Sequence, residues 1–395
     1  MQVTISPSIA CGSLQAPPSK SAAHRALIAG ALSSGCTLEG VSDSKDMEAT
    51  LGCLQNMGAT VKKMGEKVFV GGLDPYNIPS CTLDCGESGS TLRFLIPLCL
   101  ISGNKITLVG HGRLMERPLT EYELLCEEKG FLFEKQGNTL TLCGKLTAGD
   151  YTLSGERSSQ FITGMLYALP LLKGESTLKV TGNAQSVSYL HLSEQVLGDF
   201  GIKMENNDLC YRIAGAQKYQ RDRFTVEGDW SNAAFPDAFN LLGGDVCVTG
   251  LREDSTQGDK IYKEYYQKIG QELDLSDCPD LAPILFALAA VRGVSFVGCR
   301  RLRLKESDRI SAMQEELAKC GITLLAWEDR VEISPVGLCP PTRPICSHND
   351  HRIVMAMAVL LSKLGGTIEG AEAVSKSWPG FFERIRTLGI EVEIC

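Results

Sequence analysis

Apolar residues recur along the chain in a unit that occurs six times. Each unit opens on a polar or charged turn and continues into an apolar stretch of helical length that ends near a glycine. These stretches begin at Ser21, Ser88, Ser158, Ser231, Asp280 and Asp350. A segment of this length that is apolar on most sides predicts a helix buried in a protein core.

A short β-type run closed by glycine follows each apolar helix. The closing glycines are Gly40, Gly110, Gly182, Gly250, Gly298 and Gly370. An amphipathic helix comes next, as in SDRISAMQEELAKCG, and then in several units a hairpin pattern such as ATVKKMGEKVFVGG. The unit is therefore βαβαββ-like, and three such units packed together are needed to bury a shared core.

The fourth unit is shorter than its neighbours by about twenty residues. Between Lys268 and Asp280 there is no room for the usual hairpin. We expect a local deletion there. The fold class that we expect is α/β (α+β), with six repeats.

The length of 395 residues favours two domains of roughly 200 residues each, with a cleft between them. Hydrophobic content of 44% and charged content of 22% are typical of a soluble globular protein. No apolar run approaches the roughly 18 to 20 residues that a membrane span requires. The N-terminal segment MQVTISPSIACGS resembles neither a signal nor a transit peptide, so we expect a mature chain that starts near Met1 and a cytoplasmic monomer.

The sixteen cysteines do not form a metal or redox motif. No pair has C-x-x-C spacing, and the closest two are Cys81 and Cys85. We expect reduced, mostly buried thiols and no bound metal. The net charge of −8 argues against nucleic acid as a partner.

Basic residues nevertheless gather at helix starts and in the loops before them, together with serine hydroxyls. These basic residues are Lys20, Arg25, Arg113, Arg117, Arg303, Lys305, Arg309, Arg352 and Lys376. Helix N-termini present unpaired N–H groups and favour anions. The pattern predicts a site for small anions, although serines such as Ser88 and Ser158 also serve simply as helix caps.

Seven strings, in order along nearly the whole chain, resemble the signature set of the EPSP synthases, which are enolpyruvyl transferases. They are PPSKSAAHRAL, GHGRLMERPL, GERSSQFITGML, CPDLAPILFALAA, LRLKESDRISAM, NDHRIVMAMAV and SKSWPGFF. The resemblance implies a two-domain inside-out α/β barrel. One domain would span residues 19–225 and the other 1–18 plus 226–395, with an active-site cleft between them.

The resemblance also implies the ligands of two anionic substrates. Shikimate 3-phosphate would be held by Lys20, Ser21, Arg25, Ser158, Ser159, Ser186, Asp280 and Lys305. Phosphoenolpyruvate would be held by Lys20, Gly89, Arg117, Gln160, Arg309, Arg352 and Lys376. Forked guanidinium groups suit a carboxylate beside a phosphate, and Gly89 lets the backbone approach closely.

The implied reaction joins the shikimate 5-hydroxyl to C2 of phosphoenolpyruvate and releases phosphate, a step of aromatic amino acid (chorismate) biosynthesis. It needs one base and one acid, with no cofactor and no metal. Asp280 is our candidate base, with Glu306 and Lys20 as candidates for proton delivery. An N-cap role for Asp280 is the alternative, and the two roles can coexist.

Some positions depart from the family pattern. Arg301 stands where the family usually has asparagine, and Glu87, Ser88 and Ser90 differ from the common residues beside Gly89. A UDP-N-acetylglucosamine enolpyruvyl transferase would need a catalytic cysteine in GHGRLMERP, which has none. A non-catalytic anion-binding paralogue would be expected to lose the charged reacting groups, and this chain keeps them.

Overall fold

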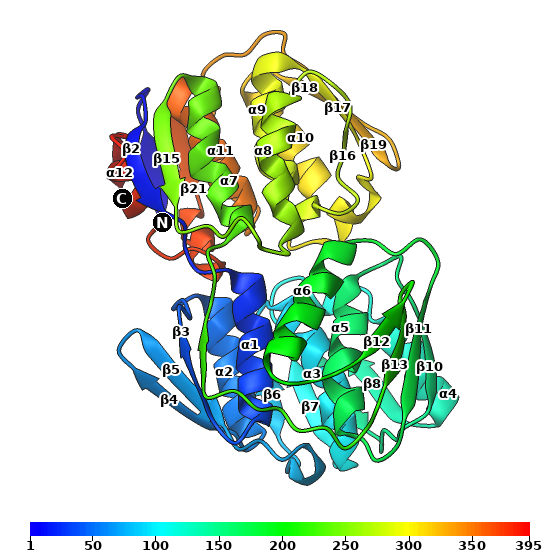
Figure 1. Ribbon diagram of the computed structural model, residues 1–395. Coiled ribbons are helices and arrows are strands. Elements are labelled where there is room, and N and C mark those ends of the chain that lie inside the picture. Colours follow the sequence, from blue (N-terminus) through cyan, green and yellow to red (C-terminus); the bar gives the residue numbers. More distant parts are fainter. The chain divides into compact units, whose positions relative to one another are not determined.

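The computed structural model describes residues 1–395, which divide into two compact units. The N-terminal unit is Lys20–Val226, and the C-terminal unit combines Met1–Ser19 with Glu227–Cys395. The predicted boundaries follow residues 18 and 225, whereas the units of the structure change one residue later, after Ser19 and Val226. Figure 1 shows the helices and strands of each unit.

The N-terminal unit holds three four-stranded sheets of one topology, with the orders β14-β3-β5-β4, β6-β7-β9-β8 and β10-β11-β13-β12. Their strands are β3 (Cys36–Glu39), β4 (Thr60–Met64), β5 (Lys67–Gly71), β6 (Thr82–Asp84), β7 (Ile106–Val109), β8 (Leu132–Gln136), β9 (Thr139–Cys143), β10 (Asp150–Ser154), β11 (Ser176–Thr181), β12 (Glu205–Asn207), β13 (Cys210–Ile213) and β14 (Arg223–Thr225). In each sheet one outer pair is parallel and the other two pairs are antiparallel.

Two helices accompany each of these sheets. They are α1 (Lys20–Leu32), α2 (Lys45–Asn56), α3 (Gly89–Ser102), α4 (Thr120–Lys129), α5 (Ser159–Ala168) and α6 (Val187–Asp199). In the pairs β6-β7 and β10-β11 the parallel connection runs through an apolar helix, and the hairpin then returns antiparallel, as the βαβαββ pattern predicts. In the remaining sheet β14, from the end of the unit, supplies the parallel partner of β3. A parallel pair needs this crossover, whereas a hairpin needs only a tight turn.

The C-terminal unit repeats the arrangement with one sheet reduced. Its sheets have the orders β16-β17-β19-β18, β20-β21-β1-β22 and β15-β2. Its strands are β1 (Gln2–Ile5), β2 (Cys11–Gln15), β15 (Asp245–Thr249), β16 (Leu273–Asp274), β17 (Val294–Val297), β18 (Thr323–Ala326), β19 (Arg330–Ser334), β20 (Ile345–Cys346), β21 (Gly366–Glu369) and β22 (Val392–Ile394). Its helices are α7 (Trp230–Ala238), α8 (Tyr262–Gln267), α9 (Ala282–Arg292), α10 (Arg309–Lys319), α11 (His351–Leu364) and α12 (Phe381–Arg386).

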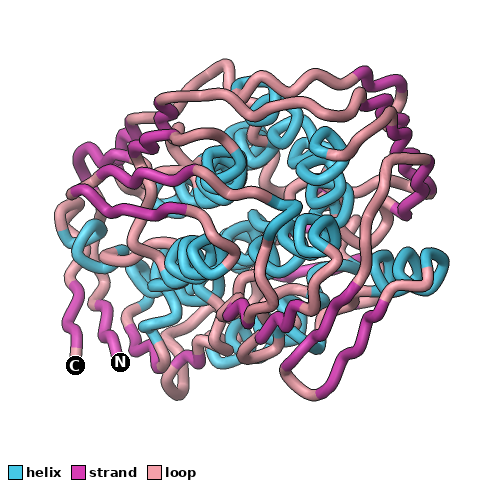
Figure 2. Tube along the Cα trace, turned by 90° about the horizontal axis from the view of Figure 1, so that it is seen from below, coloured by secondary structure: helices cyan, strands magenta, loops and turns pink.

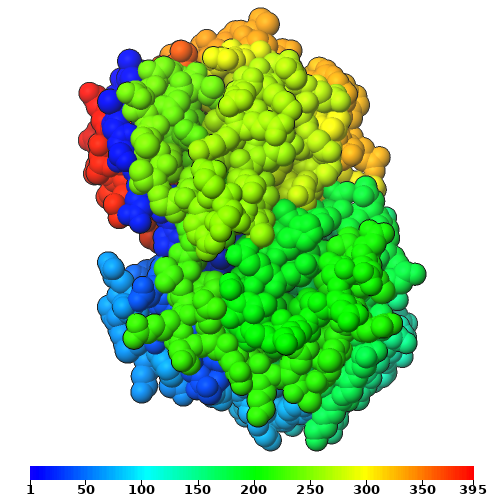
Figure 3. Space-filling model, viewed as in Figure 1, coloured from blue at the N-terminus to red at the C-terminus, as the bar shows by residue number.

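The two-stranded sheet β15-β2 belongs to the fourth repeat. After β15 the chain passes through a short 3-10 turn and α8 directly to β16, so no residues remain for a hairpin. The deletion expected from the sequence is therefore present. The first strands of the chain complete this unit, because β1 lies between β21 and β22 while β2 pairs with β15. Figure 3 shows this blue segment between the red C-terminus and green residues of the same unit.

The apolar helices form the cores, and each unit has its own. In α3, α9 and α11 nearly every side chain is buried, whereas strands bury alternate residues. In the view of Figure 2 helices occupy the middle and most strands run near the edge. The inside-out α/β fold follows from this distribution, since the most apolar elements are the helices. No helix combines the length and apolarity that crossing a bilayer would demand.

Candidate active site

The starts of α3 and α5 lie side by side in the N-terminal unit. Gln160 donates through Nε2 to the Ser90 hydroxyl at 3.0 Å and accepts from Arg93 Nη1 through Oε1 at 2.7 Å. Ser88 and Ser158 cap these helices, accepting from Thr91 N at 3.2 Å and Gln160 N at 3.3 Å. The capping interpretation therefore holds for both serines.

Arg117 lies directly against the start of α3. A Cβ added to Gly89 would meet Arg117 Nη1 at 2.6 Å, so only glycine permits this approach. The Arg117 side chain makes no hydrogen bond or ion pair within the protein, and its Nε is buried. An uncompensated guanidinium beside a helix N-terminus is a strong position for an anion.

Serine hydroxyls add further donors around the other helix starts. Ser159, buried at the start of α5, makes no side-chain hydrogen bond within the protein, and neither does the half-buried Ser21. Ser186, before α6, is buried in the left-handed region with φ 57° and ψ 46°. A serine in that conformation is strained, which is typical of functional positions.

Lys20 forms an ion pair that the sequence did not suggest. Its Nζ lies 3.0 Å from Asp46 Oδ2, and both side chains are mostly buried. Asp46 is in the first turn of α2, where its position looks like an ordinary acidic residue near a helix N-terminus. Only the spatial approach of α1 and α2 reveals the pair.

Arg25 is an interior residue in this unit. Its three guanidinium nitrogens donate to the Ser193 hydroxyl and to the backbone carbonyls of Ser21 and Tyr189, and Phe94 lies against it. Burial lowers the pKa of Arg25 to about 10. Arg25 therefore joins α1 to α6, and its contact with shikimate 3-phosphate stays a prediction.

The C-terminal unit gathers the remaining predicted residues around Asp280. This residue lies in the 3-10 turn Pro279–Leu281 that leads into α9. Its Oδ1 accepts from Arg309 Nη1 at 2.8 Å and lies 3.4 Å from Lys305 Nζ, while Oδ2 accepts from Arg352 Nη2 at 3.0 Å. The N-cap position of α9 is Leu281, whose side chain makes no capping hydrogen bond.

Arg309 is the fully buried centre of this network. Besides Asp280, it donates to Glu306 Oε2 at 2.8 Å and to Asp350 Oδ2 at 3.0 Å. Burial alone would lower its pKa, but Asp350, Glu306 and Asp280 hold it well above the usual value. A charge so deeply buried persists because three carboxylates compensate it.

Arg352 and Lys376 complete the set. Arg352, in the first turn of α11, donates to the Ser231 hydroxyl at 2.6 Å and to the Asp280 carbonyl at 3.1 Å. Lys376, at the end of the 3-10 helix Ala371–Lys376, donates to the Asn349 carbonyl at 2.6 Å. Both cations are therefore near the start of α11.

The network shifts the pKa values of two of its members. Burial would raise the pKa of Asp280, but Arg352, Lys305 and Arg309 outweigh it and hold that pKa well below its usual value. Burial lowers the pKa of Lys305 to about 8, although Asp280 opposes this, and Arg309 and Arg301 lower it further. At neutral pH the carboxylate is ionised and Lys305 is poised to titrate.

Asp350 and Arg93 are functional-site candidates that sequence reasoning missed. Asp350 is fully buried, caps α11 and accepts from both Arg309 and Ser307. The sequence shows this residue only as the first of an apolar helical stretch, in the NDHR string. Arg93 lies one helical turn into α3 and is inconspicuous in an apolar stretch.

Comparison with known proteins identifies the family. A family model described as EPSP synthase (3-phosphoshikimate 1-carboxyvinyltransferase) matches residues 6–274 and 260–385. A 3-phosphoshikimate 1-carboxyvinyltransferase of Clostridium kluyveri is 38% identical, covering 99% of this chain and 98% of the relative. That of Clostridioides difficile is 34% identical, covering 98% of each.

The fold agrees with solved structures. Two structures of EPSP synthase from Acinetobacter baumannii match with TM-scores of 0.78 and 0.80 over the whole of both chains, at 24% and 22% identity. The predicted fold class and the predicted family are confirmed. This chain belongs to the EPSP synthase (3-phosphoshikimate 1-carboxyvinyltransferase) family.

Proposed function

We propose that this chain transfers the enolpyruvyl group of phosphoenolpyruvate to the 5-hydroxyl of shikimate 3-phosphate, which gives 5-enolpyruvylshikimate 3-phosphate and phosphate. The family supports this activity, a step of the shikimate pathway. The observation that carries it is the Asp280 network, where an ionised carboxylate is surrounded by three cations. Such an arrangement offers a proton acceptor together with anion-binding groups.

Phosphoenolpyruvate binding falls to guanidinium and ammonium groups in this proposal. Arg117, uncompensated above Gly89, is available for one acidic group of that substrate. Arg352 and Lys376 would meet another acidic group, in exchange for their present protein acceptors. Arg309 is fully buried, so its guanidinium would hold Asp280 and Glu306 in place and would not bind the substrate directly.

Shikimate 3-phosphate binding falls to hydroxyls and Lys305. The Ser159 hydroxyl has no protein partner, and the neighbouring N–H groups of the α5 start favour a phosphate. That both units contribute to one site stays a prediction, as do the cytoplasmic location and the monomeric state.

In the addition step Asp280 accepts the proton of the 5-hydroxyl as its oxygen bonds to C2 of phosphoenolpyruvate. Lys20, or Glu306 in its protonated form, supplies a proton to C3, which gives a tetrahedral intermediate. One C3 proton then returns to that residue as the bond between C2 and the phosphate oxygen breaks, the proton held by Asp280 passes to the leaving phosphate, and the double bond is restored. The overall exchange therefore consumes no cofactor.

The low pKa of Asp280 appears unfavourable for a base, because a good base has a pKa near the working pH. Two of the three cations that depress it, Arg352 and Lys305, are proposed substrate ligands. Once substrate anions share those cations, their effect on Asp280 weakens and its pKa rises. Substrate binding itself therefore makes the base more effective.

Phosphate release is the direct test. Purified protein supplied with both substrates at saturation should release inorganic phosphate without added metal, and should release none with UDP-N-acetylglucosamine in place of shikimate 3-phosphate. Asp280→Asn protein is the matched blank. Tight binding of both substrates by calorimetry with no phosphate release would instead identify the non-catalytic paralogue.

A further inference from the structure

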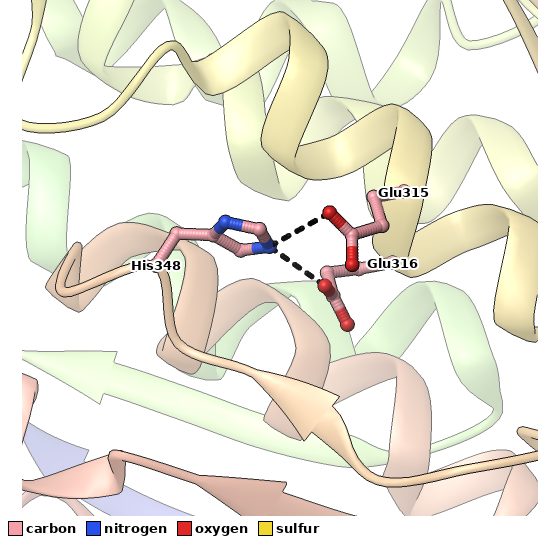
Figure 4. A group of neighbouring side chains, drawn as sticks. All are labelled: Glu315, Glu316 and His348. Carbon is pink, nitrogen blue, oxygen red and sulfur yellow. Dashed lines mark hydrogen bonds and ion pairs between the residues drawn. The ribbon is translucent and has the colours of Figure 1, made fainter.

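Outside the proposed reacting groups, the C-terminal unit has a buried cluster centred on Glu316. Glu315, Glu316 and His348 point toward one another (Figure 4), and their ligand-type atoms lie within 4.8 Å of one another. Such a group resembles a metal site. Lys319, however, already places its ammonium 2.7 Å from Glu316 Oε2 and 3.8 Å from a Glu315 oxygen. A metal ion would have to displace this buried cation, so ion pairing is the better description.

Glu316 and its partner Lys319 contact three residues of the segment that precedes α11. Its Oε2 accepts from Cys346 N at 2.9 Å, and its Oε1 lies 2.7 Å from His348 Nε2. The lysine paired with it donates to the Pro344 carbonyl at 3.1 Å. Because a carboxylate only accepts, His348 carries its proton on Nε2. We call these contacts the Glu316 clamp.

The centre of the clamp, Glu316 with Lys319, is buried. Glu316 has no exposed side-chain surface, and the Lys319 side chain is only 5% exposed. Burial would raise the pKa of Glu316, but His348, Lys319 and the Cys346 N–H hold it below the usual value. A surface ion pair contributes little, whereas a buried, hydrogen-bonded carboxylate of this kind fixes the groups that it touches.

The backbone beside the clamp is strained. His348 and Asn349 both have positive φ, at 48° and 54°. Positive φ is uncommon for non-glycine residues, and such residues usually occur singly and not in succession. Strain persists only where the surroundings impose it, and His348 is the residue whose side chain is anchored.

The strained bend determines where the Asn349 carbonyl points. That carbonyl accepts from Lys376 Nζ at 2.6 Å, and the next residue, Asp350, holds Arg309. We propose that His348, anchored on Glu316, is a positioning residue that aims the Asn349 carbonyl at Lys376 and so orients this lysine for phosphoenolpyruvate. The proposal rests on the function proposed above for Lys376.

The test compares variants at His348. Asn tolerates positive φ but is too short to reach Glu316, so His348→Asn removes the anchor without adding strain. We expect it to raise the KM for phosphoenolpyruvate on the order of 10-fold, with the KM for shikimate 3-phosphate changed by less than about twofold. His348→Gln, which can still donate to Glu316, should remain within about threefold of the unchanged protein.

Glu315→Gln is the control. The Glu315 side chain is half exposed, and its Oε2 lies 4.0 Å from His348 Nε2, beyond hydrogen-bonding distance. This variant should leave both KM values unchanged. Hydrogen exchange at residues 347–352 should speed up in His348→Asn alone, a readout independent of turnover.

Two results would overturn the proposal. One is an active His348→Asn protein with unchanged KM values, or with both KM values raised equally alongside a lower Tm. The other is a Tm increase on adding Zn²⁺ or Mn²⁺ that Glu315→Gln abolishes, which would make the cluster a metal site. Failure of the proposed function is distinguishable, because the unchanged protein would then release no phosphate.

Discussion

The two units differ in how the arginines at their candidate sites are compensated. In the N-terminal unit Arg117 has no anionic partner, and the Ser159 hydroxyl makes no hydrogen bond within the protein. In the C-terminal unit Arg309 and Arg352 are already paired with carboxylates. The first arrangement is open to an anion, whereas the second is internally neutralised. In the proposed function, anion binding and proton transfer would therefore use different kinds of charge arrangement.

Removing the carboxylate of Asp280 should have the largest effect on activity, because this residue is the centre of the neutralised network in the C-terminal unit. Asp280→Asn keeps the volume but leaves Lys305, Arg309 and Arg352 with one negative charge fewer. We expect kcat to fall by a factor on the order of 100 or more, because the proton acceptor is lost. Steady-state kinetics and calorimetric binding of shikimate 3-phosphate check this, with binding largely retained.

The matched control is Glu328→Gln, which removes an exposed carboxylate paired with Arg300 in the same unit. It should turn over normally. Equal kcat values for Asp280→Asn and this control would exclude Asp280 from the mechanism.

A methyl group added at Gly89 should disturb the position of Arg117 in the N-terminal unit. Gly89→Ala places a Cβ 2.6 Å from Arg117 Nη1, so the guanidinium must move away from the start of α3. We expect the KM for phosphoenolpyruvate to rise on the order of 10-fold, with a smaller change for shikimate 3-phosphate. Initial-rate kinetics with each substrate varied in turn separate the two effects.

Gly52→Ala provides the comparison, since an added Cβ on this residue of α2 meets nothing within 4 Å. It should leave both KM values alone and slightly stabilise the helix. A phosphoenolpyruvate KM that is unaltered by Gly89→Ala would remove Arg117 from the proposed binding group.

These two halves differ in how far the sequence alone could predict them. The repeat period and the apolar helices predicted the six-unit fold, because a continuous apolar stretch of helical length is enough to indicate a buried helix. Arg117 and Gly89 were predicted as separate ligands, but their contact depends on a loop meeting a helix start. Asp46 and Asp350 were missed, because each looks like an ordinary acidic residue at a helix start until its cation partner is known.

The pH dependence should report on Lys305, a member of the neutralised half. Its pKa of about 8 means that it loses its charge as the pH rises through that value. If Lys305 binds the substrate phosphate, kcat/KM for shikimate 3-phosphate should fall above about pH 8, by about fivefold between pH 8 and pH 9. Lys305→Arg should remove this alkaline limb, since arginine stays protonated.

Stability should change in the other direction over the same range. Between about pH 8 and the ordinary lysine value of 10.5, the unfolded chain binds more protons at this residue than the folded chain. The contribution of Lys305 to the free energy of unfolding therefore rises with pH while activity falls. A parallel decline of Tm in the unchanged protein and in Lys305→Arg would attribute the alkaline limb to unfolding instead.

The smallest effect should come from restoring the usual family residue at Arg301. Its Nη2 donates to the Ser276 carbonyl at 3.0 Å, and its charge helps lower the pKa of Lys305. Arg301→Asn should therefore move the alkaline limb upward by a fraction of a pH unit and change KM values by less than about twofold. The pH profile of kcat/KM measures the shift, and Arg300→Gln, an exposed neighbour paired with Glu328, should leave it in place. A limb that moves downward or stays fixed in Arg301→Asn would mean that the titrating group is not Lys305, and the neutralised half would then owe its pH response to another residue.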